Sequence, residues 1–424
     1  MPIQLLSLLL LLLPGAAFAG DWAFEPNTSV WGILSQRKVQ EGSLNPGNSV
    51  ARTPHQTAAL ELRPDWNLGI GVLKLTARPR LVLDHQRIKA GAATSADTDL
   101  FLRWSEGFAS WNASDALSFS YGLQNYQWGP AESASPSNRI FRDTIQVKDS
   151  FYVVNGKHLL RATYSPSNSF SEILLVELSG NGDAEPEPYE QHAKKVLLKS
   201  EFSWKGGSEY AGLVLGWRDR YGAWAGEYVS LEPLEGLSFY IDASHQAGSL
   251  AFYPARSGTT ALTAFSQSKR GESRLYTFAT GGARYAFENG NDWRLEYLFQ
   301  EAGYNRAQLA QSRAALLSRD PLQLLLNFSR AAVAAGNGLD FPGRSYLYTS
   351  GRFPSAWNLR DWNLYLRALR SLQDSSTSLL GSSENAIGER GTLIASLAAS
   401  FGSDGEELKG AVDLGATVAY RHAW

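Results

Sequence analysis

Apolar and polar residues alternate along much of this chain. In the segment 291–300, NDWRLEYLFQ, the odd positions carry Trp293, Leu295, Tyr297 and Phe299, and the even positions are mostly charged or polar. A β-strand points successive side chains to opposite faces, so this pattern predicts strands with one apolar and one polar face. The same pattern recurs at 114–124, 236–244, 361–369, 392–401 and 412–424. Each segment is close to the ten residues that a tilted strand needs to cross an outer membrane.

Turn-forming residues divide these segments. When strands are traced backwards from Trp424, nearly all short turns fall on one side and all long connections on the other, as in outer-membrane barrels. The short turns are predicted at 63–67, 165–168, 205–207, 232–236, 288–292 and 384–389, and the long connections at 40–55, 86–98, 129–156, 180–193 and 303–343. The trace gives 20 segments, some of them short. We therefore predict an all-β fold, a transmembrane antiparallel β-barrel of about 18 strands, within a range of 16 to 20.

The longest connection contains the one clear helical pattern. In RAQLAQSRAALLSR (306–319), Leu309, Arg313 and Leu316 recur at helical spacing, and Asp320-Pro321 ends the run. We expect a short helix in one extracellular loop, which either caps the mouth of the barrel or only packs against it.

The chain ends on AVDLGATVAYRHAW, in which Val418, Tyr420 and Trp424 lie on the apolar face of a strand. A sheet in lipid must close on itself to satisfy its backbone, so the first and last strands should pair. This ending resembles the C-terminal signal of Gram-negative outer-membrane proteins, in which the last residue is aromatic. His422 departs from that pattern. The resemblance implies recognition by the barrel-assembly machinery.

The first residues have the pattern of a secretory signal peptide. An apolar run from Leu5 to Leu13 is followed by Pro14-Gly15 and by Ala17-Phe18-Ala19. We expect residues 1–19 to be removed and residues 20–424 to form the barrel in the outer membrane, in contact with its lipid and lipopolysaccharide. The first predicted strand begins within a dozen residues of this point. That spacing leaves no room for a plug domain and argues against a TonB-dependent receptor.

Composition narrows the function. There are 39 Lys and Arg against 41 Asp and Glu, and this near-neutral balance argues against a nucleic-acid partner. The chain has no Cys, but 13 Trp, 18 Tyr and 19 Phe. The outward aromatics are expected to form girdles at the membrane interfaces. These are Trp66, Trp104, Trp111, Trp217, Trp293, Trp357, Trp362 and Trp424.

Residues 121–141, YGLQNYQWGPAESASPSNRIF, resemble a segment of porin-like and alginate-export-like barrels. The likeness lies in Trp128-Gly129-Pro130 and in the following Ser135-Pro136-Ser137-Asn138. It implies a passive channel for hydrophilic or anionic solutes or for polysaccharide. Arg139 and Arg142 follow in the same connection, which either folds inward as a constriction or stays exposed.

Basic residues on the polar faces are candidates for an anion pathway, because rings of Arg or Lys line anion-selective pores. They are Arg63, Lys74, Arg78, Arg80, Arg103, Arg294 and Arg367, with Arg218 and Arg421 also facing inward. The alternative is a set of ion pairs within the lumen, since carboxylates share these faces. They include Glu61, Asp84, Asp99, Glu296 and Asp413.

Enzymatic motifs are absent from the sequence. The six His residues form no metal-binding spacing, and no Gly-x-Ser-x-Gly occurs. We therefore predict no enzyme, metal or cofactor, and a porin-like channel. Two alternatives stay open. One is a non-conducting barrel for assembly or display of surface polymer, or for adhesion. The other is a barrel-embedded hydrolase that uses Ser244 and His245.

Overall fold

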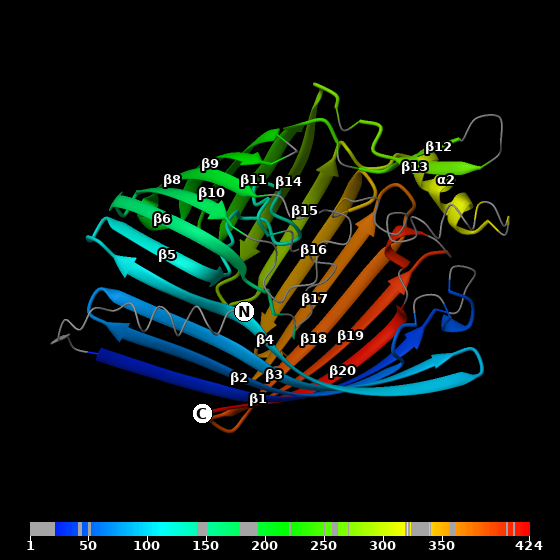
Figure 1. Ribbon diagram of the computed structural model, residues 1–424, viewed down its shortest axis with the longest axis horizontal. Coiled ribbons are helices and arrows are strands. Elements are labelled where there is room, and N and C mark those ends of the chain that lie inside the picture. The colour runs from blue at the N-terminus through cyan, green and yellow to red at the C-terminus, as the bar shows by residue number, and fades with distance from the viewer. Residues whose placement is uncertain are drawn as a thin grey trace.

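A computed structural model of the chain (Figure 1) describes most of residues 22–424. The described residues are 22–40, 45–49, 52–141, 151, 153–178, 194–219, 222–249, 251–256, 262–269, 271–318, 320, 323, 339, 341–356, 361–403, 406–409 and 412–424. The predicted signal peptide, Arg142 and Trp357 lie outside them.

Eighteen strands form one closed antiparallel barrel, in which neighbours along the chain are neighbours in the sheet. The first half is β1 (Trp22–Val39), β2 (Gln56–Ile70), β3 (Leu73–Ala90), β4 (Ala93–Asn112), β5 (Leu117–Gln124), β6 (Lys157–Ser167), β7 (Phe170–Glu177), β8 (Lys195–Trp204) and β9 (Glu209–Arg218). The second half is β10 (Gly222–Leu234), β11 (Leu237–Ala247), β14 (Leu275–Ala286), β15 (Asp292–Gln300), β16 (Ser345–Pro354), β17 (Trp362–Ser371), β18 (Thr377–Ile387), β19 (Gly391–Phe401) and β20 (Val412–Ala423). The predicted fold class and strand number are confirmed.

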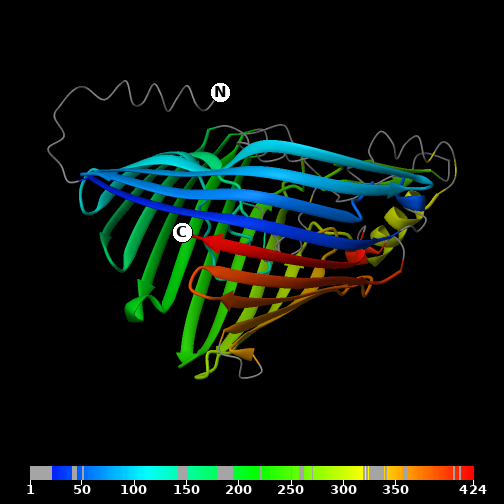
Figure 2. The same cartoon turned by 90° about the horizontal axis from the view of Figure 1, so that it is seen from below.

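The closing seam joins β1 to β20, as predicted. Their register runs from Ser29 opposite Ala423 to Val39 opposite Val412, and the Trp424 N–H donates to the Thr28 carbonyl at 3.0 Å. The last strand thus satisfies the edge of the first, which removes the unpaired backbone groups that lipid cannot tolerate. Figure 2 shows β20 beside β1, with the C-terminus at one end of the barrel.

The connections differ between the two ends. At the end that holds the C-terminus, hereafter the short-turn end, every connection has seven residues or fewer; the longest is 355–361. The opposite end, hereafter the long-loop end, carries 40–55, 125–156, 178–194, 248–274, 301–344 and 402–411. Two predictions were wrong. Residues 63–67 lie within β2, and 86–98 form a hairpin of β3 and β4 around Gly91-Ala92. Turn-favouring Pro64 and Pro79 are tolerated because they lie where the β2–β3 pairing is interrupted, between the pairs Leu62–Leu81 and Trp66–Ala77. Pro79 also lies at a register shift in the β3–β4 pairing.

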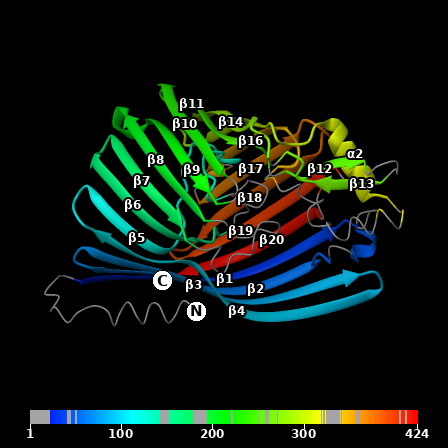
Figure 3. The same cartoon turned by 45° about the horizontal axis from the view of Figure 1, so that its top comes forward.

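Smaller elements lie in the connections of the long-loop end. Strands β12 (Tyr253–Arg256) and β13 (Thr263–Ser266) pair with each other, and helix α2 (Arg306–Leu316) lies beside them (Figures 1 and 3). The helix is shorter than the predicted 306–319. It starts at a capping box in which Asn305 and Gln308 satisfy each other's backbone N–H groups. The described residues also contain three short 3-10 turns: η1 (Pro46–Asn48) and η4 (Glu407–Lys409) at the long-loop end, and η2 (Lys205–Gly207) at the short-turn end.

The alternation of side chains sorts the wall into two faces. Outward residues such as Leu60, Leu100, Leu215 and Leu397 are half exposed or more, and they form the surface that would meet lipid. Inward residues include buried charges such as Glu296. The outward Trp residues with 40–60 % of their surface exposed are Trp66, Trp111, Trp217, Trp293 and Trp424. Among the described residues, no helix is long and apolar enough to cross a membrane.

Candidate functional site inside the barrel

The connection between β5 and β6 enters the barrel instead of covering its mouth. Residues 125–141, hereafter the inner loop, contact inward side chains of strands from β4 to β17. Farther along the same connection, Phe151 packs with Trp31, Ile394 and Ala419 on β1, β19 and β20. The segment that sequence reasoning left as either a constriction or an exposed loop is therefore folded inward over its described part.

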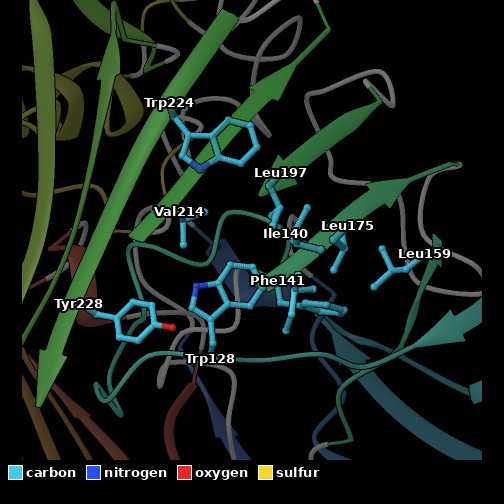
Figure 4. Close-up of a cluster of buried hydrophobic side chains, with 10 residues drawn as sticks. Trp128, Ile140, Phe141, Leu159, Leu175, Leu197, Val214, Trp224 and Tyr228 are labelled. Atoms are coloured by element: carbon cyan, nitrogen blue, oxygen red, sulfur yellow. The ribbon is translucent and has the colours of Figure 1, made fainter. Parts of the chain in front are cut away.

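One face of the inner loop is apolar. Trp128, Ile140 and Phe141 pack against inward residues of β6 to β10, and Figure 4 shows these side chains gathered between the loop and the wall. The wall residues are Leu159, Ile173, Leu175, Leu197, Val214, Trp224 and Tyr228. Apolar residues on the inner face of a water-filled barrel are unfavourable unless they are covered. Their burial supplies a hydrophobic driving force that holds the loop against this wall.

The other face of the loop is held by two fully buried carboxylates. Asp242 of β11 accepts hydrogen bonds from the Ser135 hydroxyl and from the Ser137 N–H, both at 2.7 Å. Gly129 has φ +95°, and a Cβ there would lie 2.1 Å from Asp242 Oδ2. Only glycine allows the loop to approach this carboxylate so closely.

Glu296 of β15 is the second anchor. Its Oε1 accepts from the Glu132 N–H at 2.8 Å and its Oε2 from the Ser133 N–H at 2.9 Å. The Ser133 hydroxyl and the Tyr240 hydroxyl also donate to it. Each hydrogen bond contributes about 0.5–1.5 kcal/mol net, and leaving one of these buried groups without a partner costs about 1–3 kcal/mol. The two carboxylates therefore fix the backbone of the loop.

The loop places a carboxylate among wall cations. Glu132 lies 3.4 Å from Nε of Arg294 and 3.6 Å from Nε of Arg367, and it accepts from Tyr348 and Ser350 at 2.9 Å. Arg294 also lies 3.8 Å from Glu296. Two of the sequence-predicted basic residues thus meet at the inner loop. Sequence reasoning did not identify Glu132 or Asp242, because neither belongs to a recognisable motif.

The predicted basic residues of β2 and β3 are largely paired with carboxylates. Arg63 and Arg80 reach the same oxygen of Glu61 at 2.7 and 2.6 Å. Arg78 contacts Glu106 and lies 3.0 Å from Asp65. Three guanidinium groups therefore face three carboxylates on this wall. This arrangement is the ion-pair alternative, and it leaves little excess positive charge there.

Other predicted basic residues have different surroundings. Arg103 lies over the Phe101 ring at 4.4 Å, and Arg139 donates to Ser244 and Gln246 from within the loop. Lys74 lies inward at the short-turn end of β3 and is exposed. Arg421 lies over Trp31 at 5.6 Å and donates to Thr392 at 2.8 Å.

A second basic wall lies behind the inner loop, and of its cations sequence reasoning identified only Arg218. This wall consists of the inner faces of β6 to β9, where five cations outnumber two carboxylates, Glu177 and Glu201. The cations are Lys157, Arg161, Lys195, Lys199 and Arg218. Lys195 lies 3.1 Å from Glu177, and Lys199 3.1 Å from Glu201. The loop residue Tyr126 lies 4.9 Å from the Arg161 guanidinium. The alternating cations of 157–161 and 195–199 could have revealed this wall.

A cavity of about 360 Å³ opens beneath the loop toward the short-turn end. It is lined by Gly129, Pro130, Ser208, Tyr210, Ser230, Glu232, Gly236, Ser238, Tyr240, Arg284, Ala286 and Arg294. Arg284 and Arg294 are directly opposite each other on β14 and β15. Like charges in this position destabilise a sheet unless a counter-charge is near. Asp292 supplies the counter-charge, because it forms an ion pair with Arg284. The cavity is also rich in hydroxyl groups.

The geometry separates the residues of the hydrolase alternative. Ser244 points inward and lies 3.3 Å from Arg139, whereas His245 points outward and contacts Glu227 and Thr277 at 2.8 and 2.9 Å. The two side chains are on opposite faces of β11, so they cannot act as a dyad. In the described part of the chain, no group of three His, Cys, Asp or Glu side chains is placed to hold a metal ion.

Neither protein-family models nor curated sequences match this chain. Solved structures do. OccAB1 of Acinetobacter baumannii is similar with a TM-score of 0.57 at 11% identity, over 96% of this chain and 98% of that one. OccK5 (OpdH) of Pseudomonas aeruginosa has a TM-score of 0.53 at 11% identity, over 94% and 97%.

A third similar structure is Wzi of Escherichia coli, described as an outer-membrane, carbohydrate-binding β-barrel involved in group 1 capsule assembly. Its TM-score is 0.53 at 12% identity, over 96% of this chain and 85% of that one. All three are Gram-negative outer-membrane β-barrels. At these identities the likeness shows the fold alone, which is that of an outer-membrane β-barrel.

Proposed function

We propose that this protein is an outer-membrane channel for passive passage of small hydrophilic solutes, with a preference for anionic ones. The observation that carries the proposal is the inner loop, which is fixed across a polar lumen by Asp242 and Glu296. A loop held inside the barrel narrows the path and places Arg294 and Arg367 beside it. Selectivity in such a channel follows from the charges and hydrogen-bonding groups that line the narrow part.

The proposed orientation places the long-loop end outside the cell and the short-turn end in the periplasm, as in other outer-membrane barrels. In this orientation β20 ends in the periplasm. Its outward residues Val418, Tyr420 and Trp424 are 43–58% exposed, and they would be available to the barrel-assembly machinery. The signal peptide at 1–19 would be removed during export.

The charge distribution refines the anion pathway. Arg63, Arg78 and Arg80 are matched by Glu61, Asp65 and Glu106, so they contribute little net attraction. Arg284 and Arg294 line the cavity beneath the loop, where hydroxyl groups offer further hydrogen bonds. An anion would be attracted there, would be held weakly by several groups and would then leave by diffusion.

Planar-bilayer recording tests this proposal. The wild type should give steady conductance with a preference for anions, and R284Q/R294Q should lower that preference. The matched control is R370Q, which removes an exposed outward cation of β17. Steady conductance with unchanged ion selectivity in R284Q/R294Q would contradict the anion pathway. Silence of the wild type would contradict the channel itself.

A non-conducting barrel that binds surface polymer is the second candidate. The hydroxyl-rich cavity, with Tyr210 and Tyr240 beside two arginines, favours it, as does the likeness to the carbohydrate-binding Wzi. Silence in bilayers together with saturable quenching of tyrosine and tryptophan fluorescence by an acidic polysaccharide would support this function. The structural neighbours are not enzymes, and we expect no hydrolysis of lipid or peptide by the purified protein.

A further inference from the structure

The outward face of β1 to β4 changes character along the strands. Two rows of leucine lie side by side across β2, β3 and β4: Leu62, Leu81 and Leu102, and above them Leu60, Leu83 and Leu100. All six are exposed, Leu100 to 68%. They form an apolar surface that lipid acyl chains would cover.

Toward the long-loop end, polar residues replace the leucines on β3 and β4 in the next row, while Leu34 and Ala58 continue the apolar surface on β1 and β2. His85 and Thr98 are opposite each other on β3 and β4, and their side chains form a hydrogen bond of 2.8 Å. One row farther, Gln56 donates to Gln36 at 3.0 Å, and Arg87 lies opposite Gln56. These hydrogen-bonded side chains lie at a level between the leucines and the end of the sheet.

The last row is cationic. Lys89 follows Arg87 on the same outward face of β3, and Lys38 follows Gln36 on β1. The Lys38 side chain is 75% exposed, and its only ion pair among the described residues is a 4.0 Å contact with Asp413, which Lys409 holds more closely at 2.8 Å. Arg87 and Lys89 are exposed and form no ion pair within the described part of the chain. We call Lys38, Arg87 and Lys89 the cationic rim.

Near the tip of the β3–β4 hairpin, between Asp84 and Asp99, the two faces carry opposite charge. Asp84, Asp97 and Asp99 point to the lumen side, and Asp84 and Asp99 are directly opposite each other. The cations are therefore segregated to the outward face. A solvated surface with no partner would gain nothing from this separation, whereas an anionic partner on the outside would be attracted by one face and repelled by the other.

We infer that this face binds a phosphorylated glycolipid of the outer leaflet. Its acyl chains would lie on the six leucines, its sugar hydroxyls would meet the His, Thr and Gln rows, and its phosphates would lie against the cationic rim. The order apolar, hydrogen-bonding, cationic matches the order of groups in such an amphiphile. Lysine and arginine at the headgroup level attract anionic lipid within about a Debye length.

Native mass spectrometry of the detergent-purified full chain tests this inference. The probes are a bisphosphorylated lipid A, its dephosphorylated form and phosphatidylglycerol, with a chelator present so that divalent cations form no bridges. Wild type should retain the bisphosphorylated form preferentially. The variant K38Q/R87Q/K89Q should retain it about 10- to 100-fold less. The matched control, K194Q/R370Q/R390Q, neutralises three cations elsewhere and should behave as wild type.

Equal retention of the dephosphorylated lipid or of phosphatidylglycerol by wild type would overturn the inference, and so would an equal loss in both triple variants. The lipid comparison on wild type needs no variant to fold. Each variant is first checked for heat-dependent migration on gels, which folded barrels show. Conductance is measured on the same preparations, so failure of lipid binding is distinguishable from failure of the proposed channel.

Discussion

Asp242 of β11 accepts a hydrogen bond of 2.7 Å from the backbone N–H of Ser137, although 105 residues separate them in the chain. Asp242 is fully buried, and Glu296 of β15 binds the same loop by the same means. The inner loop is thus fixed by carboxylates of the wall, and its position depends on a small number of polar contacts.

Removal of both anchors should release the inner loop. In D242A/E296A the loop loses hydrogen bonds to buried carboxyl groups that contribute about 0.5–1.5 kcal/mol each. We expect faster amide hydrogen exchange in residues 129–138 and larger, noisier conductance. The control is E227A. Glu227 lies on the outward face of β10, and in the described part of the chain its one ion pair is with His245. Wild-type exchange rates in D242A/E296A would show that the apolar face alone fixes the loop.

Gly129 should not tolerate a side chain. A Cβ there would lie 2.1 Å from Asp242 Oδ2 and 2.2 Å from Ser135 Oγ, and φ is +95°. We expect G129A to displace the loop at a cost of about 1–3 kcal/mol and to alter conductance without preventing barrel formation. G281A is the matched control, since nothing lies within 4 Å of a Cβ at Gly281. If G129A and G281A give the same currents, the close approach at Asp242 has no bearing on the path.

The outward aromatic residues of the closing strand should matter for assembly more than for stability. Tyr420 and Trp424 are 43% and 58% exposed, so their replacement by alanine opens no core cavity. We expect Y420A/W424A to lower the amount of folded protein in the outer membrane several-fold. Refolding of the purified variant into detergent should be nearly unchanged. W111A removes an equally exposed outward aromatic of β4 and should assemble normally. An equal loss of folded protein in Y420A/W424A and in W111A would show that assembly depends on outward aromatic residues in general and not on those of the closing strand.

The loop 402–411 should loosen as the pH rises. Burial raises the pKa of the Glu407 carboxyl from 4.5 to about 7; the hydrogen bond from Tyr346 opposes this shift, and the nearby Asp374 carboxylate adds to it. The folded form therefore binds the proton more tightly than the unfolded form. The resulting stabilisation of about 1–3 kcal/mol is complete below about pH 4.5 and is lost as the pH approaches 7.

Limited proteolysis of this loop, in the full barrel, at pH 5 and pH 8 measures the effect. Wild type should be cut more slowly at pH 5 after correction for the protease's own pH dependence. E407Q keeps the hydrogen-bonding shape but cannot titrate, so its corrected rates should be equal at both values. A pH dependence that persists in E407Q would show that Glu407 is not the titrating group.

Alternation in single segments was sufficient to predict the barrel, but it did not locate every connection. The span 86–98 contains Lys, Ala, Gly, Thr and Ser and has no apolar face, so it has the composition of a loop. It nevertheless forms the tip of the β3–β4 hairpin, where both faces are exposed at the end of the sheet. A strand outside the lipid needs no apolar face, and its sequence therefore carries no strand pattern.

The candidate site was only partly accessible from sequence. The alternating pattern correctly placed Arg63, Arg78 and Arg80 inward, but it could not show that Glu61 lies between Arg63 and Arg80. The pairing of these charges depends on strand register. Similarly, Lys157 follows the alternating pattern, yet its burial beside the Phe141 ring depends on how the inner loop folds back into the barrel.

The sequence by itself determined the class of fold, the closure of β1 on β20 and the face on which the residues of the alternating segments lie. These properties depend on alternation, which is local, and on the requirement that a sheet in lipid has no free edge. Only the tertiary structure decided that the inner loop crosses the lumen and which charges meet there. Those contacts join residues more than 100 positions apart, such as Ser137 with Asp242, and no local pattern encodes such a pairing.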